Sequence, residues 1–191
     1  GGINLGVAAL RCSEVYLVLN PDLQLRAGAI VAMLSALGPK DAVVAPQVRD
    51  ANGELQYSLR REPTLLRAAG LGRTGLPCFS EFHRRASDYT STRHVDWAMG
   101  AALLIRMCAH RELGGWDESY FLHSEETDFL LRARDKGLHT RYAPDAIVVH
   151  EGQGSGYDGG STACRWSTGL GSTAGVIAPP RPCSTCSRPR C

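Results

Sequence analysis

A short apolar run near the start of the chain constrains the fold more than any other feature of the sequence. Val15–Leu19 (Val-Tyr-Leu-Val-Leu) is rich in residues that favour strands, and such a run is typical of a strand buried on both faces of a parallel sheet. It ends at Asn20-Pro21-Asp22, after which apolar residues recur at helical spacing. A strand, a polar turn and a helix in this order predict an α/β architecture.

The helix expected after this turn has a clear end. Gly38 is expected to adopt the left-handed conformation that commonly follows a last helical turn, and Pro39 cannot continue a helix. The apolar residues at helical spacing are Ala27, Ile30, Val31, Leu34 and Leu37.

The α/β pattern continues as far as His150. A second helix is predicted between an N-cap at Ser124 and Gly137, because acidic residues fill its first turn and basic residues its last. The other expected elements are strands at 41–46 and 95–106, a hairpin turn at 50–53, a strand pair at 142–150 interrupted by Pro144-Asp145, and a long surface excursion with one short helix at 60–93.

Composition narrows the class of protein. The 191 residues include 21 basic and 19 acidic ones, a balance too even for non-specific binding to nucleic acid. The longest apolar stretch, 97–105, is shorter than the roughly 20 residues that a membrane-spanning helix needs, and no signal peptide is visible. We expect one folded domain over residues 1–155 and a disordered, low-complexity tail over 156–191. A zinc site in this tail, formed by Cys164, Cys183, Cys186 and Cys191, is a competing interpretation.

Asp22 is the first candidate for chemistry. It follows the carboxyl end of a buried strand, where open α/β sheets gather their ligands. A carboxylate there could hold Mg²⁺ or Mn²⁺ together with the phosphates of a substrate. The alternative is that Asp22 caps the following helix.

The segment Glu125-Glu126-Thr127-Asp128 is the second candidate. Three carboxylates in one turn repel one another, which raises the proton affinity of at least one of them, as a general base requires. The alternative is an acidic first turn that complements the helix dipole.

Three further residues each allow two interpretations. His150 ends an apolar strand and could bind a metal, or it could simply be satisfied by a hydrogen bond. Trp97 and Trp116 lie beside glycine-containing segments and could stack on a sugar ring, or they could pack in the core.

The order of these motifs along the sequence makes the chain resemble the rhamnosyltransferase-like group of inverting, family 2 type glycosyltransferases. Many members of that group build bacterial cell-envelope polysaccharides from nucleotide-activated sugars. The resemblance covers about residues 1–150. The matching residues are Gly2-Ile3-Asn4-Leu5-Gly6, Leu19-Asn20-Pro21-Asp22, Pro46 to Asn52-Gly53, Val95-Asp96-Trp97 with Gly100-Ala101-Ala102, Gly114-Gly115-Trp116-Asp117-Glu118, Phe121 to Glu125-Glu126-Thr127-Asp128, Arg132, Gly137 and His150.

The resemblance implies a role for each candidate. Glu126, with Glu125 beside it, matches the position of the general base, where the family usually has Asp. Asp22 and His150 match ligands of a divalent cation, Mg²⁺ or Mn²⁺. Asn20, Asp22, Asp96 and Gly100 are implied to contact the donor or its diphosphate, and Trp97, Gly115, Trp116 and Asp117 the acceptor.

The resemblance also implies a fold and a function. The fold would be a partial GT-A (nucleotide-diphospho-sugar transferase) fold, with a mixed, mostly parallel sheet flanked by helices, and the family's first βα units would precede Gly1. The activity would be transfer of a rhamnose-like sugar or a hexose from a nucleotide-diphosphate sugar to a cell-envelope glycan or lipid-linked acceptor. Such an enzyme is expected in the cytoplasm or peripherally at the inner face of the plasma membrane.

Two rival functions remain at this point. One is a catalytically inactive remnant or non-enzymatic module that keeps the half-fold. The other is a metal-dependent phosphoryl or nucleotidyl transferase that uses Asp22 and Glu126, against which stands the lack of a P-loop.

Overall fold

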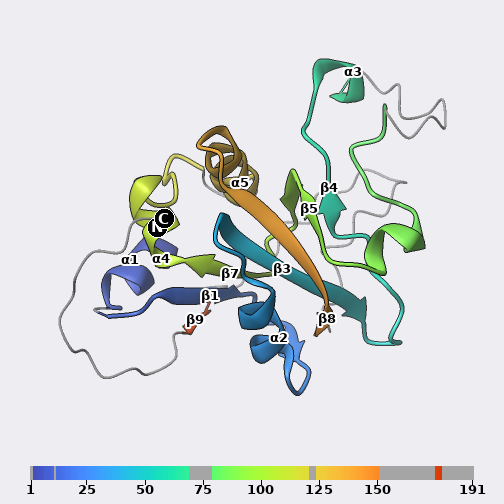
Figure 1. The fold of residues 1–191 in the computed structure, drawn as a ribbon, viewed down its shortest axis with the longest axis horizontal. Coiled ribbons are helices and arrows are strands. Elements are labelled where there is room, and N and C mark those ends of the chain that lie inside the picture. The colour runs from blue at the N-terminus through green and yellow to red at the C-terminus, as the bar shows by residue number, and fades with distance from the viewer. Residues whose placement is uncertain (1, 11, 69–78, 121–123, 151–174, 178–191) are drawn as a thin grey trace, which may run out of the picture.

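A mixed β-sheet forms the centre of the molecule (Figure 1). The computed structural model describes residues 2–10, 12–68, 79–120, 124–150 and 175–177. The seven-stranded sheet has the order β2-β8-β3-β7-β1-β9, with β5 paired to β8, and β4 pairs with β6 in a separate two-stranded sheet. The strands are β1 (Val15–Leu19), β2 (Leu23–Leu25), β3 (Asp41–Asp50), β4 (Leu59–Arg60), β5 (Arg93–Val95), β6 (Trp97–Ala98), β7 (Ala102–Arg106), β8 (His139–His150) and β9 (Gly175–Ile177).

The helices are short and lie mainly between the strands in sequence. They are α1 (Gly2–Ala8), α2 (Ala29–Ala36), α3 (Leu65–Ala68), α4 (Met107–Glu112), α5 (Glu125–Asp135) and the 3₁₀ helix η3 (Ala86–Tyr89). The predicted α/β class is therefore confirmed. None of the helices in the described part of the chain is long and apolar enough to cross a membrane.

The sheet is mixed, as predicted, but its parallel share is smaller than expected. Within the described residues, β3 and β8 form the parallel pair, while β1 and β3 each pair antiparallel with β7. The expectation of a mostly parallel sheet was wrong because an apolar run indicates burial on both faces, and a central antiparallel strand is buried just as fully. Since β7 runs opposite to both neighbours, β1, β3 and β8 still point the same way.

The apolar run of β1 is explained by burial of the strand on both faces of the sheet. Tyr16 and Val18 belong to one hydrophobic cluster, whereas Val15 and Leu17 belong to another. Because side chains alternate along a strand, these clusters lie on opposite faces of the sheet. The first cluster includes Phe129, Leu130 and Ala133 of α5, and the second includes Met33 of α2, so helices cover both faces.

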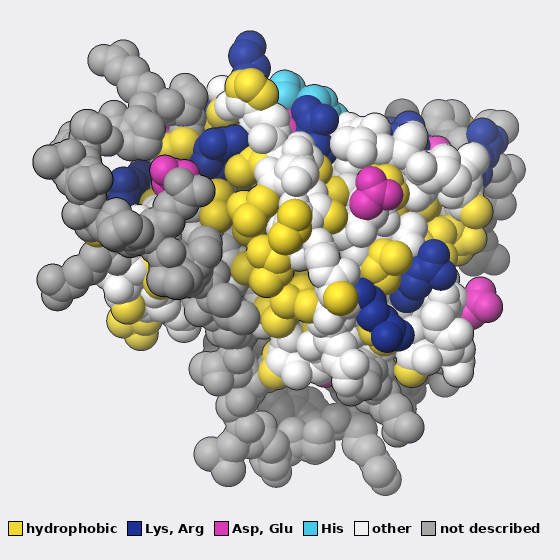
Figure 2. Space-filling view, turned by 60° about the horizontal axis from the view of Figure 1, so that its bottom comes forward, with side chains coloured by type: hydrophobic (Ala, Val, Ile, Leu, Met, Phe, Trp, Pro, Cys, Tyr) yellow, Lys and Arg dark blue, Asp and Glu magenta, His cyan; other side chains and the backbone are white. Residues whose placement is uncertain are grey.

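Helix α2 forms where the apolar spacing predicted, but it turns a different side to the core. Ala29 and Met33 are buried, whereas Ile30, Val31 and Leu34 are 37%, 65% and 40% exposed. Figure 2 shows hydrophobic side chains gathered over this part of the surface. The predicted left-handed Gly38 was also wrong, because Leu37 already leaves the helix in an extended conformation. The Gly38 amide instead donates to the Asp41 carboxylate at 2.7 Å.

Two predictions in the second half of the sheet differ in outcome. The hairpin turn at 50–53 is confirmed: Gly53 has a φ of 84°, and the Asp50 amide donates to the Glu54 carbonyl at 2.9 Å. By contrast, the interrupted strand pair at 142–150 is one continuous strand, β8. Its pairing with β3 shifts register between Pro46 and Gln47, and this irregularity accommodates the Pro144-Asp145 segment.

The expectation of one strand over 95–106 was also wrong. Three strands, β5, β6 and β7, occupy this region, and a turn at residues 100–101 lies between the last two. The predicted excursion at 60–93 contains β4, α3 and η3 in its described part. The expected disordered tail and the competing cysteine site lie outside the described residues apart from β9.

Candidate active site

The candidate site lies at one edge of the sheet, where three strands end. Strands β1, β3 and β8 run in the same direction, so their carboxyl ends meet at this edge. The Asn20 amide donates to the Ala101 carbonyl at 3.0 Å, which joins the end of β1 to the turn before β7. The carboxyl ends of such strands are the usual place for ligands in open α/β sheets.

Asp22 and His150 meet at this edge although 128 positions separate them in the sequence. The pairing of Leu23 with His150 in the β2–β8 ladder brings them together. His150 Nε2 lies 2.9 Å from Asp22 Oδ2, and the imidazole is mostly buried while the carboxylate is 41% exposed. The two side chains predicted to share a cation are therefore neighbours.

The second carboxylate oxygen of Asp22 is suited to a cation. Asp22 Oδ1 is buried and has no hydrogen-bond partner among the described residues. A buried carboxylate oxygen without a donor is costly, and a bound cation would remove that cost. Across the described residues, no group of three or more His, Cys, Asp or Glu side chains could hold a metal ion. This pair fits a cation whose remaining ligands come from a substrate and water.

Glu126 lies directly over Gly100. A Cβ added at Gly100 would come within 3.3 Å of the Cβ, Cγ and Cδ atoms of Glu126. Gly100 in turn precedes Ala101, whose carbonyl accepts from Asn20. Gly100 and Ala101 therefore connect the predicted base, Glu126, to the turn that carries Asp22.

The start of α5 is unusual in its backbone. Ser124 is at the predicted N-cap position with a φ of 73°, and its side chain makes no capping hydrogen bond. Among the described residues with a side chain, Ser124 is the one non-glycine residue at positive φ. Glu125 Oε2 is buried, and no described residue forms a hydrogen bond with it. Strain and an unsatisfied acceptor at the same helix start are typical of a functional site.

Arg132 fixes α5 against the segment that contains the predicted acceptor residues. Its guanidinium donates to the Leu113 and Gly115 carbonyls at 2.8 and 3.1 Å, and it pairs with Asp128 at 2.6 Å. Gly115, Trp116 and Asp117 line a surface hollow of about 370 Å³ together with Arg132.

The two tryptophans have different surroundings. The Trp116 ring is 6% exposed, stacks on Phe129 with ring centres 4.6 Å apart and donates from Nε1 to the Tyr16 hydroxyl. Trp116 is therefore a core side chain. Of the two interpretations, the structure favours packing over stacking on a sugar, because Phe129 covers the indole ring. Trp97 is half-buried and donates to the Arg61 carbonyl at 3.0 Å.

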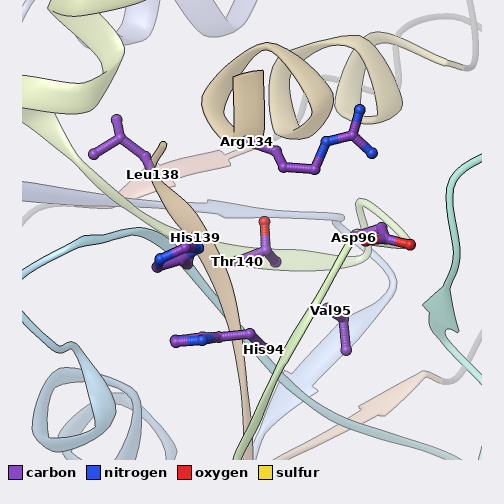
Figure 3. A pocket seen from close by; sticks show the side chains of 7 residues that line it. All are labelled: His94, Val95, Asp96, Arg134, Leu138, His139 and Thr140. Atoms are coloured by element: carbon purple, nitrogen blue, oxygen red, sulfur yellow. The ribbon is translucent and has the colours of Figure 1, made fainter. Parts of the chain in front are cut away.

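Asp96 lies in another cavity, of about 140 Å³ (Figure 3). Its Oδ2 accepts from the Glu62 amide at 2.9 Å, and Arg134 of α5 and the imidazoles of His94 and His139 line the same cavity. Neighbouring Val95 pairs with Thr140 near the start of β8, whereas His150 ends that strand. The structure does not bring Asp96 to the Asp22–His150 pair, and its contact with the donor stays a prediction.

Comparison with known proteins points to one family. Residues 78–170 match the glycosyl transferase family group 2. The chain is 33% identical over 141 residues, 70% of its length, to the N-acetylglucosaminyl-diphospho-decaprenol L-rhamnosyltransferase of Mycobacterium tuberculosis, and covers 46% of that protein. It is 27% identical to the rhamnosyltransferase WbbL of Escherichia coli over 181 residues, and this alignment covers 86% of this chain and 66% of WbbL. It is also 27% identical over 155 residues to the hexosyltransferase Agl10 of Haloferax volcanii, 78% of this chain and 47% of that one. The chain thus spans from about half to two thirds of the length of these relatives.

Proposed function

Since the chain belongs to the rhamnosyltransferase-like, family 2 glycosyltransferases, we propose that it transfers a rhamnose-like sugar or a hexose from a nucleotide-diphosphate sugar to a lipid-linked or cell-envelope glycan acceptor. The observation that carries this proposal is the convergence of Asp22, His150, Gly100 and Glu126 at one edge of the sheet. A carboxylate–imidazole pair suits a diphosphate-bound cation, and a second carboxylate close by suits a base. This arrangement is what a GT-A-like catalytic half needs.

The donor would bind with its diphosphate at the end of β1. The Asn20 turn positions the Asp22 carboxylate there, and His150 Nε2 lies 2.9 Å from it, close enough for the two side chains to share one cation. Mg²⁺ or Mn²⁺ held by Asp22 and His150 would neutralise the charge that develops on the departing diphosphate. The absence of a side chain at Gly100 leaves room for Glu126 beside this position.

Glu126 would act as the general base. Its carboxylate would take the proton of the acceptor hydroxyl while that oxygen attacks the anomeric carbon from the face opposite the diphosphate, which inverts the configuration at that carbon. Arg132 keeps the helix that carries Glu126 in register with the 113–117 segment, which we assign to the acceptor side.

Product analysis tests this function. The purified protein is assayed with Mg²⁺ or Mn²⁺, a panel of nucleotide-diphosphate sugars and a short-chain N-acetylglucosaminyl-diphospho-prenol. We expect acceptor-dependent release of a nucleoside diphosphate and a loss of turnover of about 100-fold or more in Asp22→Ala. The matched control is Asp145→Ala, which removes an exposed carboxylate of β8 that lies away from the proposed cation site. Release of pyrophosphate would favour a nucleotidyl transferase, and turnover unaffected by Asp22→Ala would reject the proposed site.

A further inference from the structure

Arg60 is a buried cation that forms no salt bridge with the described residues. It is 8% exposed, and its Nη1 donates to the carbonyls of Tyr57 and Leu59. Its guanidinium lies 4.0 Å from the centre of the Phe82 ring and 5.9 Å from that of Trp97. No carboxylate pairs with Arg60 within the described part of the chain, although buried charges are normally paired.

Aromatic faces and backbone carbonyls offset only part of the cost of burying this charge. A guanidinium has five N–H donors in a planar fork that matches the oxygens of carboxylates and phosphates. Burial lowers the pKa of Arg60, and the charge of nearby Glu81 opposes this effect without overcoming it. The fork therefore has capacity for an anion from outside the chain.

Met99 occupies the position such an anion would take. Arg60 Nη2 donates to Met99 Sδ at 3.2 Å, and a thioether is a weak acceptor. The Met99 side chain is flexible and 40% exposed, so a charged oxygen could displace it. Ser58 adds a second donor: it is two residues before Arg60, and its buried hydroxyl has no hydrogen-bond partner in the described part of the chain.

This cluster lies beside the candidate active site. Met99 precedes Gly100, against which Glu126 packs, and the Met99 amide donates to the Ser58 carbonyl at 3.0 Å. Arg60 is also the cross-strand partner of Trp97, a residue expected on the acceptor side. A substrate that reaches Glu126 would therefore pass close to Arg60.

We propose that Arg60 binds a phosphate oxygen of a diphosphate-bearing substrate, replacing its contact with the Met99 thioether. The inference rests on the proposed function and assigns to that site a binding residue for the diphosphate group. The Arg60–Trp97 pairing points to the acceptor as the source of the diphosphate. The nucleotide of the donor is the other source of the same chemistry, and the experiment separates the two.

Calorimetric binding of two probes tests the proposal. Farnesyl diphosphate represents a lipid-linked acceptor without its sugar, and UDP with Mn²⁺ represents the leaving nucleotide. In Arg60→Met, which keeps the apolar stem, we expect affinity for farnesyl diphosphate to fall by about 10- to 100-fold, the range for a lost charged hydrogen bond, while UDP affinity is unchanged. The matched control is Arg84→Met, because Arg84 is exposed and also lies over the Phe82 ring, at 4.9 Å.

Each outcome has a definite meaning. A loss for UDP instead would identify the diphosphate as that of the nucleotide, and unchanged affinity for both probes would overturn the proposal. If Arg60→Met does not fold, Met99→Leu decides: removal of the competing thioether should tighten binding of farnesyl diphosphate, and equal or weaker binding would overturn the proposal. Probe binding requires no turnover, so a wild-type protein that binds both probes but transfers no sugar would contradict the proposed function alone.

Discussion

Gly100 has little freedom to vary at the candidate site. Its Cα faces the side chain of Glu126 so closely that an added Cβ would lie 3.3 Å from three of its carbons. That distance requires the neighbour to shift by a few tenths of an ångström, and catalytic geometry is sensitive to small displacements. The effect of a methyl group here should therefore appear in catalysis more than in folding.

We accordingly predict that Gly100→Ala lowers kcat by about 10-fold or more while the melting temperature stays close to that of the wild type. Steady-state kinetics and thermal unfolding would measure the two effects. Gly2→Ala is the control, because a Cβ there meets nothing within 4 Å. An undiminished kcat in Gly100→Ala would show that the position of Glu126 is not critical for turnover.

Individual site residues differ in how far the sequence could predict them. The pairing of Asp22 with His150 follows from a ladder contact between distant strands, which local pattern does not contain, so only family resemblance pointed to it. The burial of Trp116 depends on Tyr16 and Phe129, which are equally remote in sequence. Arg60 gave no signal of its own, since it is one of many basic residues in its segment.

At the scale of elements, α5 is held in place by both apolar packing and hydrogen bonds. Its apolar residues Phe129 and Leu130 pack in the core, while Arg132 reaches out to two backbone carbonyls of the 113–115 segment. A hydrogen bond from a charged donor contributes more to stability than a neutral one, so removal of the donor costs more free energy.

Removal of this contact should therefore destabilise the protein. We expect Arg132→Met to lower the free energy of unfolding by about 1.5 to 3 kcal/mol, as measured by urea denaturation. Arg134→Met on the same helix is the control; its ion pairs with Glu62 and Asp135 are partly exposed and should contribute about 1 kcal/mol at most. Equal losses in the two variants would mean that Arg132 does not anchor α5.

Elements with a strong local sequence pattern could be predicted, but the side that each element turns to the core could not. The apolar run of β1 and the charge pattern of α5 specify those elements within a few residues. The side of α2 that meets the core depends on the position of Met33 against the sheet, which spacing alone does not reveal. Likewise, β8 continues past Pro144 because β3 pairs with it on both sides of the irregularity.

At the scale of the whole molecule, one buried chain of hydrogen bonds joins three segments. Trp116 Nε1 donates to the Tyr16 hydroxyl at 3.0 Å, and that hydroxyl lies 2.8 Å from His110 Nδ1. Because the hydroxyl proton is free to point at Nδ1, the chain favours a neutral imidazole. Burial lowers the pKa of His110 from its usual 6.5, and the nearby Arg111 and Arg132 lower it further.

This chain predicts how stability depends on pH. Between the lowered pKa of folded His110 and about 6.5, the unfolded state binds more protons, so stability is present above about pH 6.5 and is lost as pH falls through that window. His83, whose pKa burial also lowers, should add to the loss. We expect His110→Asn, which keeps an acceptor for Tyr16, to lose less stability than the wild type between pH 7.5 and pH 5.5 in urea denaturation. The same loss in both proteins would contradict this role for His110.

We propose that Glu126 is the general base of the reaction, whereas other residues bind the cation, the donor and the acceptor. The most direct test is the kcat of Glu126→Gln for acceptor-dependent release of nucleoside diphosphate at saturating donor, relative to that of the wild type. We predict a fall of about 100- to 10,000-fold with unchanged donor affinity, and a substantially smaller fall in Glu126→Asp, which keeps a base. A Glu126→Gln protein that turns over at the wild-type rate would contradict the claim.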